Sequence, residues 1–235
     1  DLVLAHAKDF FNGAGLDLHV RTKISSFFSY MEAAALRIGT HVMEFHPTMA
    51  LLNGHTILPE DLPMTLMAKD KQYGITLSVG KRSTHRMDWK LDTHAKAKST
   101  IIVHFYKEFS TVKIDGNSKD FGDAQGLLGE YKTGQWKGRD GGISPTFEEH
   151  AFDWQVNTLD GDPQLFASVE DTPQLPYERC HMPTLGRPSR RLMRSDQAFH
   201  QRAEEACARI AGTEDFELCV DDVMTTREVG LAELW

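Results

Sequence analysis

The sequence predicts a mainly β protein, in which an antiparallel β-sandwich-like body is followed by a small C-terminal α-helical hairpin. Up to about residue 115, apolar and polar residues alternate in several short runs. Turn residues such as Asn12-Gly13 and Asn53-Gly54 separate these runs at roughly even spacing. Helical spacing of apolar residues appears only near the end of the chain. Many short strands without long helices between them favour an antiparallel sandwich or meander over an α/β fold.

Individual strands are predicted where the alternation is clearest. Residues 16–21 alternate Leu, Leu and Val with Asp, His and Arg, which indicates one dry and one wet face. Lys107 and Glu108 separate two β-rich runs and predict a hairpin. Residues 29–39 fit a helix by propensity and a strand by context, and we expect a strand. The remaining predicted strands are 73–79, 87–91, 100–106 and 109–114.

The composition changes near residue 172, where four prolines occur within a short span. Proline extends the chain and interrupts regular structure, so this stretch is expected to be a linker. The chain is thereby divided into a β domain over 1–172, a Pro/Arg-rich linker over 173–194 and a helical hairpin over 195–235. The prolines are Pro173, Pro176, Pro183 and Pro188.

The last part of the chain predicts two amphipathic helices joined by a tight turn. Ser195 is a natural N-cap for the first helix, and Gly212 is a natural stop after it. Thr213 or Glu214 then opens a second helix that continues to about Glu228.

The chain has three cysteines, and two of them lie in this helical pair. Cys207 lies about one turn before the break, and Cys219 lies one to two turns after it. A Cys207–Cys219 disulfide is therefore sterically reasonable and would clip a helical pair too small for its own core. The third, Cys180, leaves an odd thiol in this chain. Buried or free thiols remain the alternative.

Charge and hydropathy exclude several classes of partner. The net charge of -8 opposes general nucleic-acid binding, which needs a basic surface. The sequence has no apolar run long enough to span a bilayer. The first residues lack the basic and apolar regions of a signal peptide and predict a strand, so we expect further residues upstream of Asp1.

The usual catalytic signatures are missing from the sequence, and we predict that the protein is not an enzyme. Gly126-Leu127-Leu128-Gly129 lacks the Lys-Ser/Thr that completes a phosphate-binding loop, so a structural turn is expected. Glu148, Glu149 and His150 would point in alternating directions on a strand and would not converge on one substrate. The eleven histidines are scattered, and hydrogen-bonded roles are favoured over a shared zinc site.

Acidic residues surround the turn formed by residues 126–129, which we call the glycine turn, and they make calcium binding a candidate function. Calcium takes six to eight oxygen ligands, which loops rich in Asp, Asn and Gly supply. Glu130 and Asp140 are the candidates within the loop, but Lys137 and Arg139 are poor neighbours for a divalent cation. A solvated loop is the alternative.

The stretch from Phe121 to Val156 resembles the closing part of a von Willebrand factor type D domain. In that family a Gly-Leu-Cys-Gly turn precedes a polar, often calcium-binding loop and a Phe-x-x-x-Trp-x-Val strand. Here the turn is Gly-Leu-Leu-Gly, and the segment ends in Trp154-Gln155-Val156. Residues 1–6 and 13–22 resemble the first strands of the domain. The combination is most similar to the cysteine-poor secreted or surface type D proteins of diatoms and related algae.

The resemblance implies a site pattern that departs from the family's. Leu128 stands where the family has a cysteine, so that disulfide is lost. Cys180 is expected to pair with a cysteine outside this chain. The family's calcium loop directly follows the turn, at positions that here begin with Glu130. Arg190 to Leu192 resembles a processing motif of some algal silica-associated proteins.

The resemblance further implies a non-catalytic structural or adhesion module that assembles with other proteins or with copies of itself. Its location would be the cell surface, the extracellular space or the lumen of the secretory pathway. No cofactor would be required, apart from possible calcium. Two alternatives remain open, namely a calcium-dependent adhesion module and a hydrolase with a His/carboxylate cleft between sheets.

Overall fold

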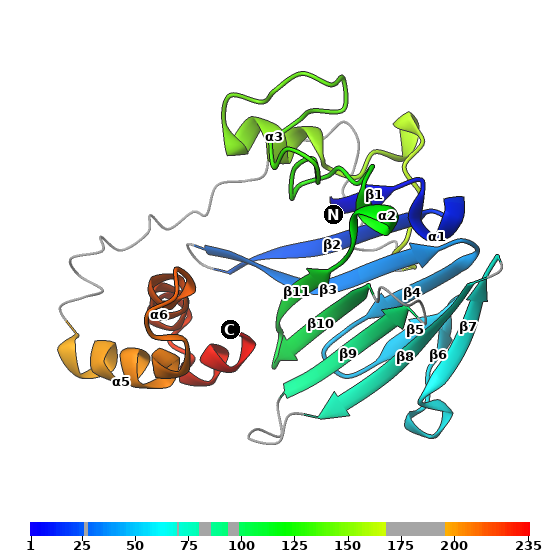
Figure 1. The fold of residues 1–235 in the computed structure, drawn as a ribbon. Coiled ribbons are helices and arrows are strands. Elements are labelled where there is room, and N and C mark those ends of the chain that lie inside the picture. The colour runs from blue at the N-terminus through cyan, green and yellow to red at the C-terminus, as the bar shows by residue number, and fades with distance from the viewer. Residues whose placement is uncertain (26–27, 70, 80–85, 94–98, 168–195) are drawn as a thin grey trace.

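The computed structural model describes residues 1–25, 28–69, 71–79, 86–93, 99–167 and 196–235. One antiparallel sheet of eleven strands dominates it (Figure 1). The main path runs β6-β5-β4-β3-β11-β10-β9-β8-β7, and β2 pairs with β3 while β1 pairs with β2. The strands are β1 Leu2–Ala7, β2 Leu16–Ser25, β3 Phe28–Ile38, β4 His41–Phe45, β5 Ala50–Leu52, β6 His55–Thr56, β7 Met64–Ala68, β8 Lys71–Val79, β9 Arg86–Thr93, β10 Thr100–Tyr106 and β11 Phe109–Asp115.

The sheet curls around a single large core. Strand β4 is separated from β9 by three other strands along the sheet, yet the Phe45 and Trp89 rings lie 5.7 Å apart. Leucines of β2 and β3 belong to the same buried cluster as Val103 and Phe105 of β10. The prediction of a mainly β, antiparallel body is confirmed, and its strands form one continuous curled sheet.

Two local strand predictions are also confirmed. Residues 107 and 108 connect β10 to β11, with Lys107 in the left-handed conformation (φ 53°) that a tight turn needs. The ambiguous stretch 29–39 is strand β3, which pairs with β2 from Phe28 to Ile38 and with β4 at its second half. Pairing on both sides satisfies its backbone groups and overrides the helix propensity of its alanines.

The expectation of a wet face on β2 is wrong. Asp17, His19 and Arg21 are all at most 5% exposed. Residues 157–167 lie over this face, where Leu165 and Phe166 pack on the alanines of β3. Alternation along a strand distinguishes its two faces, but a covering segment distant in sequence decides whether the polar face meets water.

Segment 147–153 is a helix, so the expectation of a strand that places Glu148, Glu149 and His150 on alternating faces is wrong. Thr146 caps this helix, α3 (Phe147–Asp153), by accepting a hydrogen bond from the Glu149 backbone N–H. Two glutamates in its first turn further favour it. The other short helices are α1 Phe10–Gly13, α2 Ser118–Phe121, η1 Pro59–Asp61 and η2 Thr158–Asp160.

Two longer helices near the C-terminus confirm the helical part of the prediction. They are α5 Gln197–Cys207 and α6 Asp215–Thr226, with short 3-10 turns η3 Ala208–Ile210 and η4 Val229–Leu234. The observed N-cap of α5 is Asp196, whose side chain accepts from the Phe199 backbone N–H. Tyr106 and Phe109 belong to the core of the helical pair, so the helices bury their apolar face on the end of the sheet. Ser195 and the predicted linker 173–194 lie outside the described residues.

Candidate functional site

The glycine turn seals the edge of β1. The Leu127 N–H donates to the Val3 carbonyl (2.9 Å), and Gln125 forms a β-bridge with His6. A Cβ atom on Gly126 would lie only 2.5 Å from the Leu4 carbonyl oxygen. Only glycine therefore allows the backbone to approach β1 so closely. The turn is structural, as its sequence predicts.

The loop that follows the turn is held firmly in place. The Arg139 guanidinium donates to the carbonyl oxygens of Asp153 (2.7 Å) and Gln155 (3.0 Å). It also forms a two-point ion pair with Asp162 (2.8 and 2.7 Å) and lies over the Trp154 ring. One arginine thus ties the loop to the end of α3 and to the segment that covers β2.

The two calcium candidates, Glu130 and Asp140, are engaged with their own turns. Glu130 accepts hydrogen bonds from Lys137 (3.0 Å) and Thr133 (2.8 Å), and the bond from Lys137 holds the pKa of this carboxyl below its usual value. Asp140 accepts from the Gly142 backbone N–H (2.8 Å). Within the described residues, His, Cys, Asp and Glu side chains form no cluster suited to a metal ion. Calcium binding remains a prediction.

The same loop and the first residue of α3 present apolar side chains to solvent. Trp136 is 42% exposed, Ile143 65% and Phe147 51%. The Trp136 and Phe147 rings meet edge to face at 5.5 Å. Ile143 is brought to this region by a β-bridge to Lys137, next to Trp136. We refer to Trp136, Ile143 and Phe147 as the loop patch.

A mainly apolar hollow of about 390 Å³ lies next to the glycine turn. Phe121 and Ala124 are buried at its base. The exposed side chains of Leu128 and Tyr131 border it. The position at which the type D family has a cysteine therefore carries an exposed leucine at the edge of a hollow.

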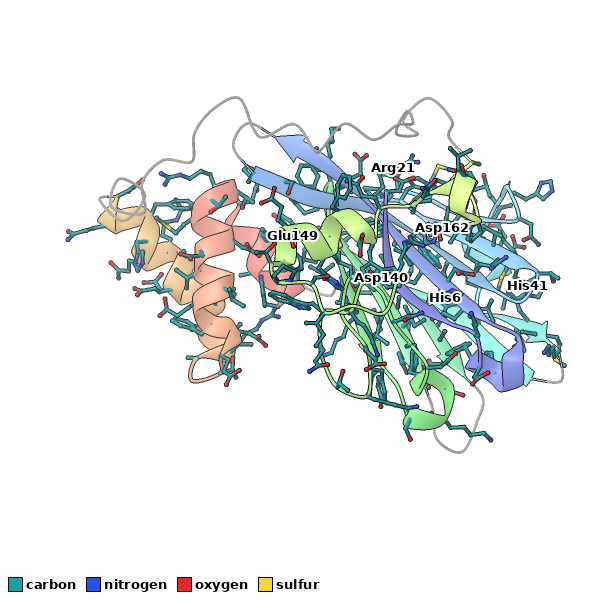
Figure 2. All side chains as sticks on the ribbon, turned by 90° about the horizontal axis from the view of Figure 1, so that it is seen from above. His6, Arg21, His41, Asp140, Glu149 and Asp162 are labelled. Atoms are coloured by element: carbon teal, nitrogen blue, oxygen red, sulfur yellow. A yellow bond between two sulfur atoms is a disulfide. The ribbon has the colours of Figure 1, made fainter. Side chains whose placement is uncertain are left out.

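The buried polar face of β2 contains charged side chains that interact with one another. Figure 2 labels two residues of this region, His6 and Arg21. Asp17 contacts His6 (2.6 Å) and Arg37. Burial raises the pKa of Asp17, but the hydrogen bonds from His6 and Arg37 outweigh burial and hold it below its usual value. Burial lowers the pKa of His19 to about 4, and among the described residues neither ring nitrogen of His19 has a hydrogen-bond partner. Leu165 and Phe166 pack on the alanines of β3, and the Arg21 guanidinium lies over the Phe166 ring, so these groups belong to the packing of the sheet.

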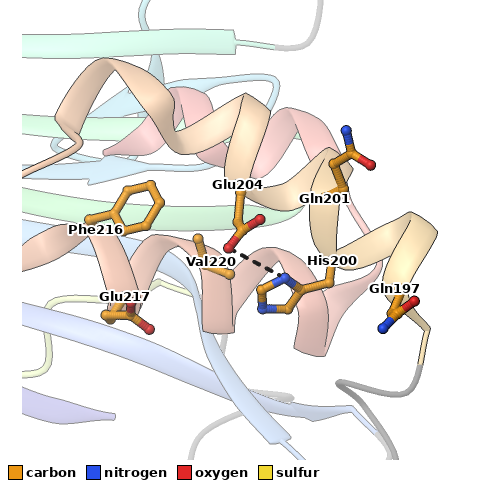
Figure 3. A pocket seen from close by; sticks show the side chains of 7 residues that line it. All are labelled: Gln197, His200, Gln201, Glu204, Phe216, Glu217 and Val220. Atoms are coloured by element: carbon orange, nitrogen blue, oxygen red, sulfur yellow. Dashed lines mark ion pairs between the residues drawn. The ribbon is translucent and has the colours of Figure 1, made fainter.

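A cleft lined by histidine and glutamate lies between α5 and α6, rather than between sheets as the hydrolase alternative expects (Figure 3). Its volume is about 380 Å³. His200 Nδ1 lies 3.5 Å from Glu204 Oε1, and Glu217 projects from the other helix. The described lining residues include no Ser, Thr or Cys. An acid–base pair is present there without an adjacent side-chain nucleophile.

The predicted Cys207–Cys219 disulfide is present and joins the end of α5 to α6. Both cysteines are fully buried. Cys180 and the Arg190–Leu192 motif lie outside the described residues.

Two features were not predicted from the sequence. The loop patch was not predicted because its residues are spread over a polar, glycine-rich stretch. A Trp and an Ile in such a stretch nevertheless indicate an exposed apolar surface. The buried His19 was missed because its covering segment begins more than 130 residues later in the chain.

Together the fold and these surfaces define a mainly β protein with one curled antiparallel sheet, a helical pair closed by a disulfide and an exposed apolar loop. No protein-family model matches the chain, and no curated protein matches it. The type D resemblance therefore remains a prediction. In the part of the chain that the structure describes, no helix is both long and apolar enough to cross a membrane.

Proposed function

We propose that this protein is a non-catalytic structural or adhesion module that assembles with other proteins or with copies of itself. The observation that carries the proposal is the loop patch. Three large apolar side chains are exposed on a loop and on the start of α3, and Arg139 and several backbone hydrogen bonds hold this region in one shape. Apolar surface kept exposed on an ordered loop is typical of a contact surface.

The aromatic pair of the patch is suited to such a contact. Trp and Tyr are the residues that most often carry binding energy at protein interfaces, because they bury much area at low entropic cost. Trp136 and Phe147 already touch, so binding would cost little further ordering of these two side chains. The hollow beside Leu128 offers a second place in the same segment for an apolar anchor from a partner.

The proposed location is extracellular, at the cell surface or in the lumen of the secretory pathway. The disulfide between α5 and α6 supports it, because disulfides persist mainly in oxidising compartments. We further propose that the curled sheet is a type D body of sandwich-like form. The sequence of the glycine turn and the closing Trp154-Gln155-Val156 supports this assignment.

The proposal is tested by measuring the native mass of the full chain without reductant, alone and mixed with extracellular matrix proteins of its source. Trp136→Ser with Phe147→Ser should abolish or weaken the assembly at least tenfold, the loss expected for an interface anchor. Leu159→Ser is the matched control, since Leu159 is 79% exposed and lies outside the patch. A wild-type chain that stays strictly monomeric and binds none of these proteins would contradict the proposal.

A further inference from the structure

The outer face of β9, β10 and β11 carries an ordered grid of polar side chains. Ile102 of β10 is flanked by Lys90 on β9 and Lys113 on β11. Two further rows of cross-strand neighbours lie beside this one. The first consists of Asp92, Thr100 and Asp115. The second consists of Asp88, His104 and Thr111. The alternate residues Ile101, Val103 and Phe105 face the core. This face therefore has a basic row between two rows that contain carboxylates.

The C-terminal segment 228–235 lies over this face and is anchored there. Lys107 Nζ donates to both carboxylate oxygens of Glu228 at 2.8 Å. Gly230 packs so closely on Tyr106 that a Cβ atom would lie 2.1 Å from the hydroxyl oxygen. Arg209 donates to the Ala232 carbonyl. These contacts fix the segment as one wall of a groove.

Between the sheet and this wall is a cavity of about 450 Å³, within the usual range for small-molecule sites. Three cationic side chains line it, namely Lys90, Lys113 and Arg209. Two carboxylates, Asp115 and Glu233, and the indole of Trp235 also line it. Lys90 also contacts Asp92 at 3.0 Å. The groove thus combines charges of both signs with one aromatic surface.

The geometry points to this groove as a binding site for an acidic sugar, that is, a saccharide unit with a carboxylate or sulfate group. The lysines and the arginine supply donors for the oxyanion. The two carboxylates accept hydrogen bonds from sugar hydroxyls. The indole of Trp235, whose N–H is hydrogen-bonded to Asp222, offers an apolar surface for the C–H face of the ring.

The groove is lined by side chains of both charge signs, which argues against a ligand that carries charge of one sign only. A bare polyanion would be repelled by Asp115 and Glu233, and a cation by Lys90, Lys113 and Arg209. The whole chain carries a net charge of -8, so general attraction of polyanions is unfavourable and affinity has to come from the groove itself. The groove and the loop patch share no residue, so this inference does not depend on the proposed assembly function.

The test is calorimetric titration of the full chain with three disaccharides, one containing glucuronate, one sulfated and one neutral. Inorganic sulfate at matched ionic strength is a fourth probe. We expect the two acidic disaccharides to bind at least tenfold more tightly than the neutral one. Lys113→Gln should weaken their binding about tenfold, as expected for the loss of one charged hydrogen bond. Lys119→Gln makes the same charge change at an exposed site on α2 and should leave binding unchanged.

Trp235→Ala should weaken the binding of all three disaccharides. Four outcomes would overturn the inference. They are no binding of the acidic disaccharides at millimolar concentration, equal binding of neutral and acidic disaccharides, sulfate binding as tight as that of the sulfated disaccharide, and equal effects of Lys113→Gln and Lys119→Gln.

Discussion

Asp17 and His19 lie two residues apart on the same buried face of β2, yet their surroundings favour opposite charge states. Asp17 has His6 and Arg37 as partners, which favour its ionised form. In the part of the chain that the structure describes, His19 has no hydrogen-bond partner for either ring nitrogen, and burial favours its neutral form. Strand β2 therefore buries one charged and one neutral polar group side by side.

This arrangement predicts how stability depends on pH. The pKa of His19 is lowered from 6.5 to about 4 in the folded protein. The unfolded chain takes up this proton first, so the contribution of His19 to the free energy of unfolding should fall as the pH drops from 6.5 towards 4, by up to about 3 kcal/mol. Burial raises the pKa of Asp222 from 3.8 to about 6, so Asp222 changes the free energy of unfolding in the opposite direction over the same pH range. The stabilisation by Asp17, whose pKa is lowered, is lost as the pH falls through its unfolded value of 3.8 and below, mainly under this window.

Urea unfolding at pH 7, 5.5 and 4.5 measures the effect. Because His19→Leu removes this contribution, the difference in unfolding free energy between wild type and His19→Leu should fall by up to about 3 kcal/mol between pH 6.5 and 4. The exposed His55 provides the matched control, because His55→Gln should retain the wild-type slope. An unchanged slope in the His19→Leu protein would show that His19 is not the group that titrates.

At the scale of the elements, the stability of the helical pair α5 and α6 depends on the Cys207–Cys219 disulfide. The disulfide joins residues 12 positions apart, and the helices bury only one face on the sheet. Cys207→Ala with Cys219→Ala should lower the free energy of unfolding by about 3 kcal/mol, mainly because the unfolded chain gains freedom. Urea unfolding of the variant and of the reduced wild type should agree. No loss of stability in either would contradict this role.

The glycine turn is the second element whose stability rests on single residues. Gly126→Ala places a methyl group 2.5 Å from the Leu4 carbonyl and should destabilise the protein by about 2 kcal/mol or more. Gly134→Ala is the control, since Gly134 also has a positive φ (67°) but open space around it. Its cost should stay near 1 kcal/mol. Thermal unfolding compares the two, and equal losses would rule out the close approach to β1 as the cause.

At the scale of the whole molecule, the loop patch and the groove belong to different parts of the fold. The patch is carried by the loop and helix beside the edge of β1, whereas the groove lies where the C-terminal segment meets β9–β11 (Figure 1). Each surface is held by contacts between segments distant in sequence. The ion pair of Arg139 with Asp162 holds the loop of the patch, and the ion pair of Lys107 with Glu228 holds the wall of the groove. Variants in one surface should therefore leave the other intact.

Much of the local structure could be predicted because it depends on neighbours in the chain. The alternation around residues 16–21 and the turn at Lys107 and Glu108 are local signals, and β2 and the β10–β11 hairpin follow them. The spacing of Cys207 and Cys219 around a helix break likewise sufficed to predict their disulfide. Helix α3 was missed although Thr146 and the glutamates after it are a local signal, because the resemblance favoured a strand.

By itself the sequence determined that the chain is mainly β, with two helices and a disulfide near its C-terminus, since periodicity and capping act within a few residues. Only the tertiary structure decided that the polar face of β2 is buried, that Trp136 and Phe147 meet in the open, and that Lys113 and Arg209 line one groove. Burial and proximity depend on which distant segments pack together, and no local pattern encodes that pairing.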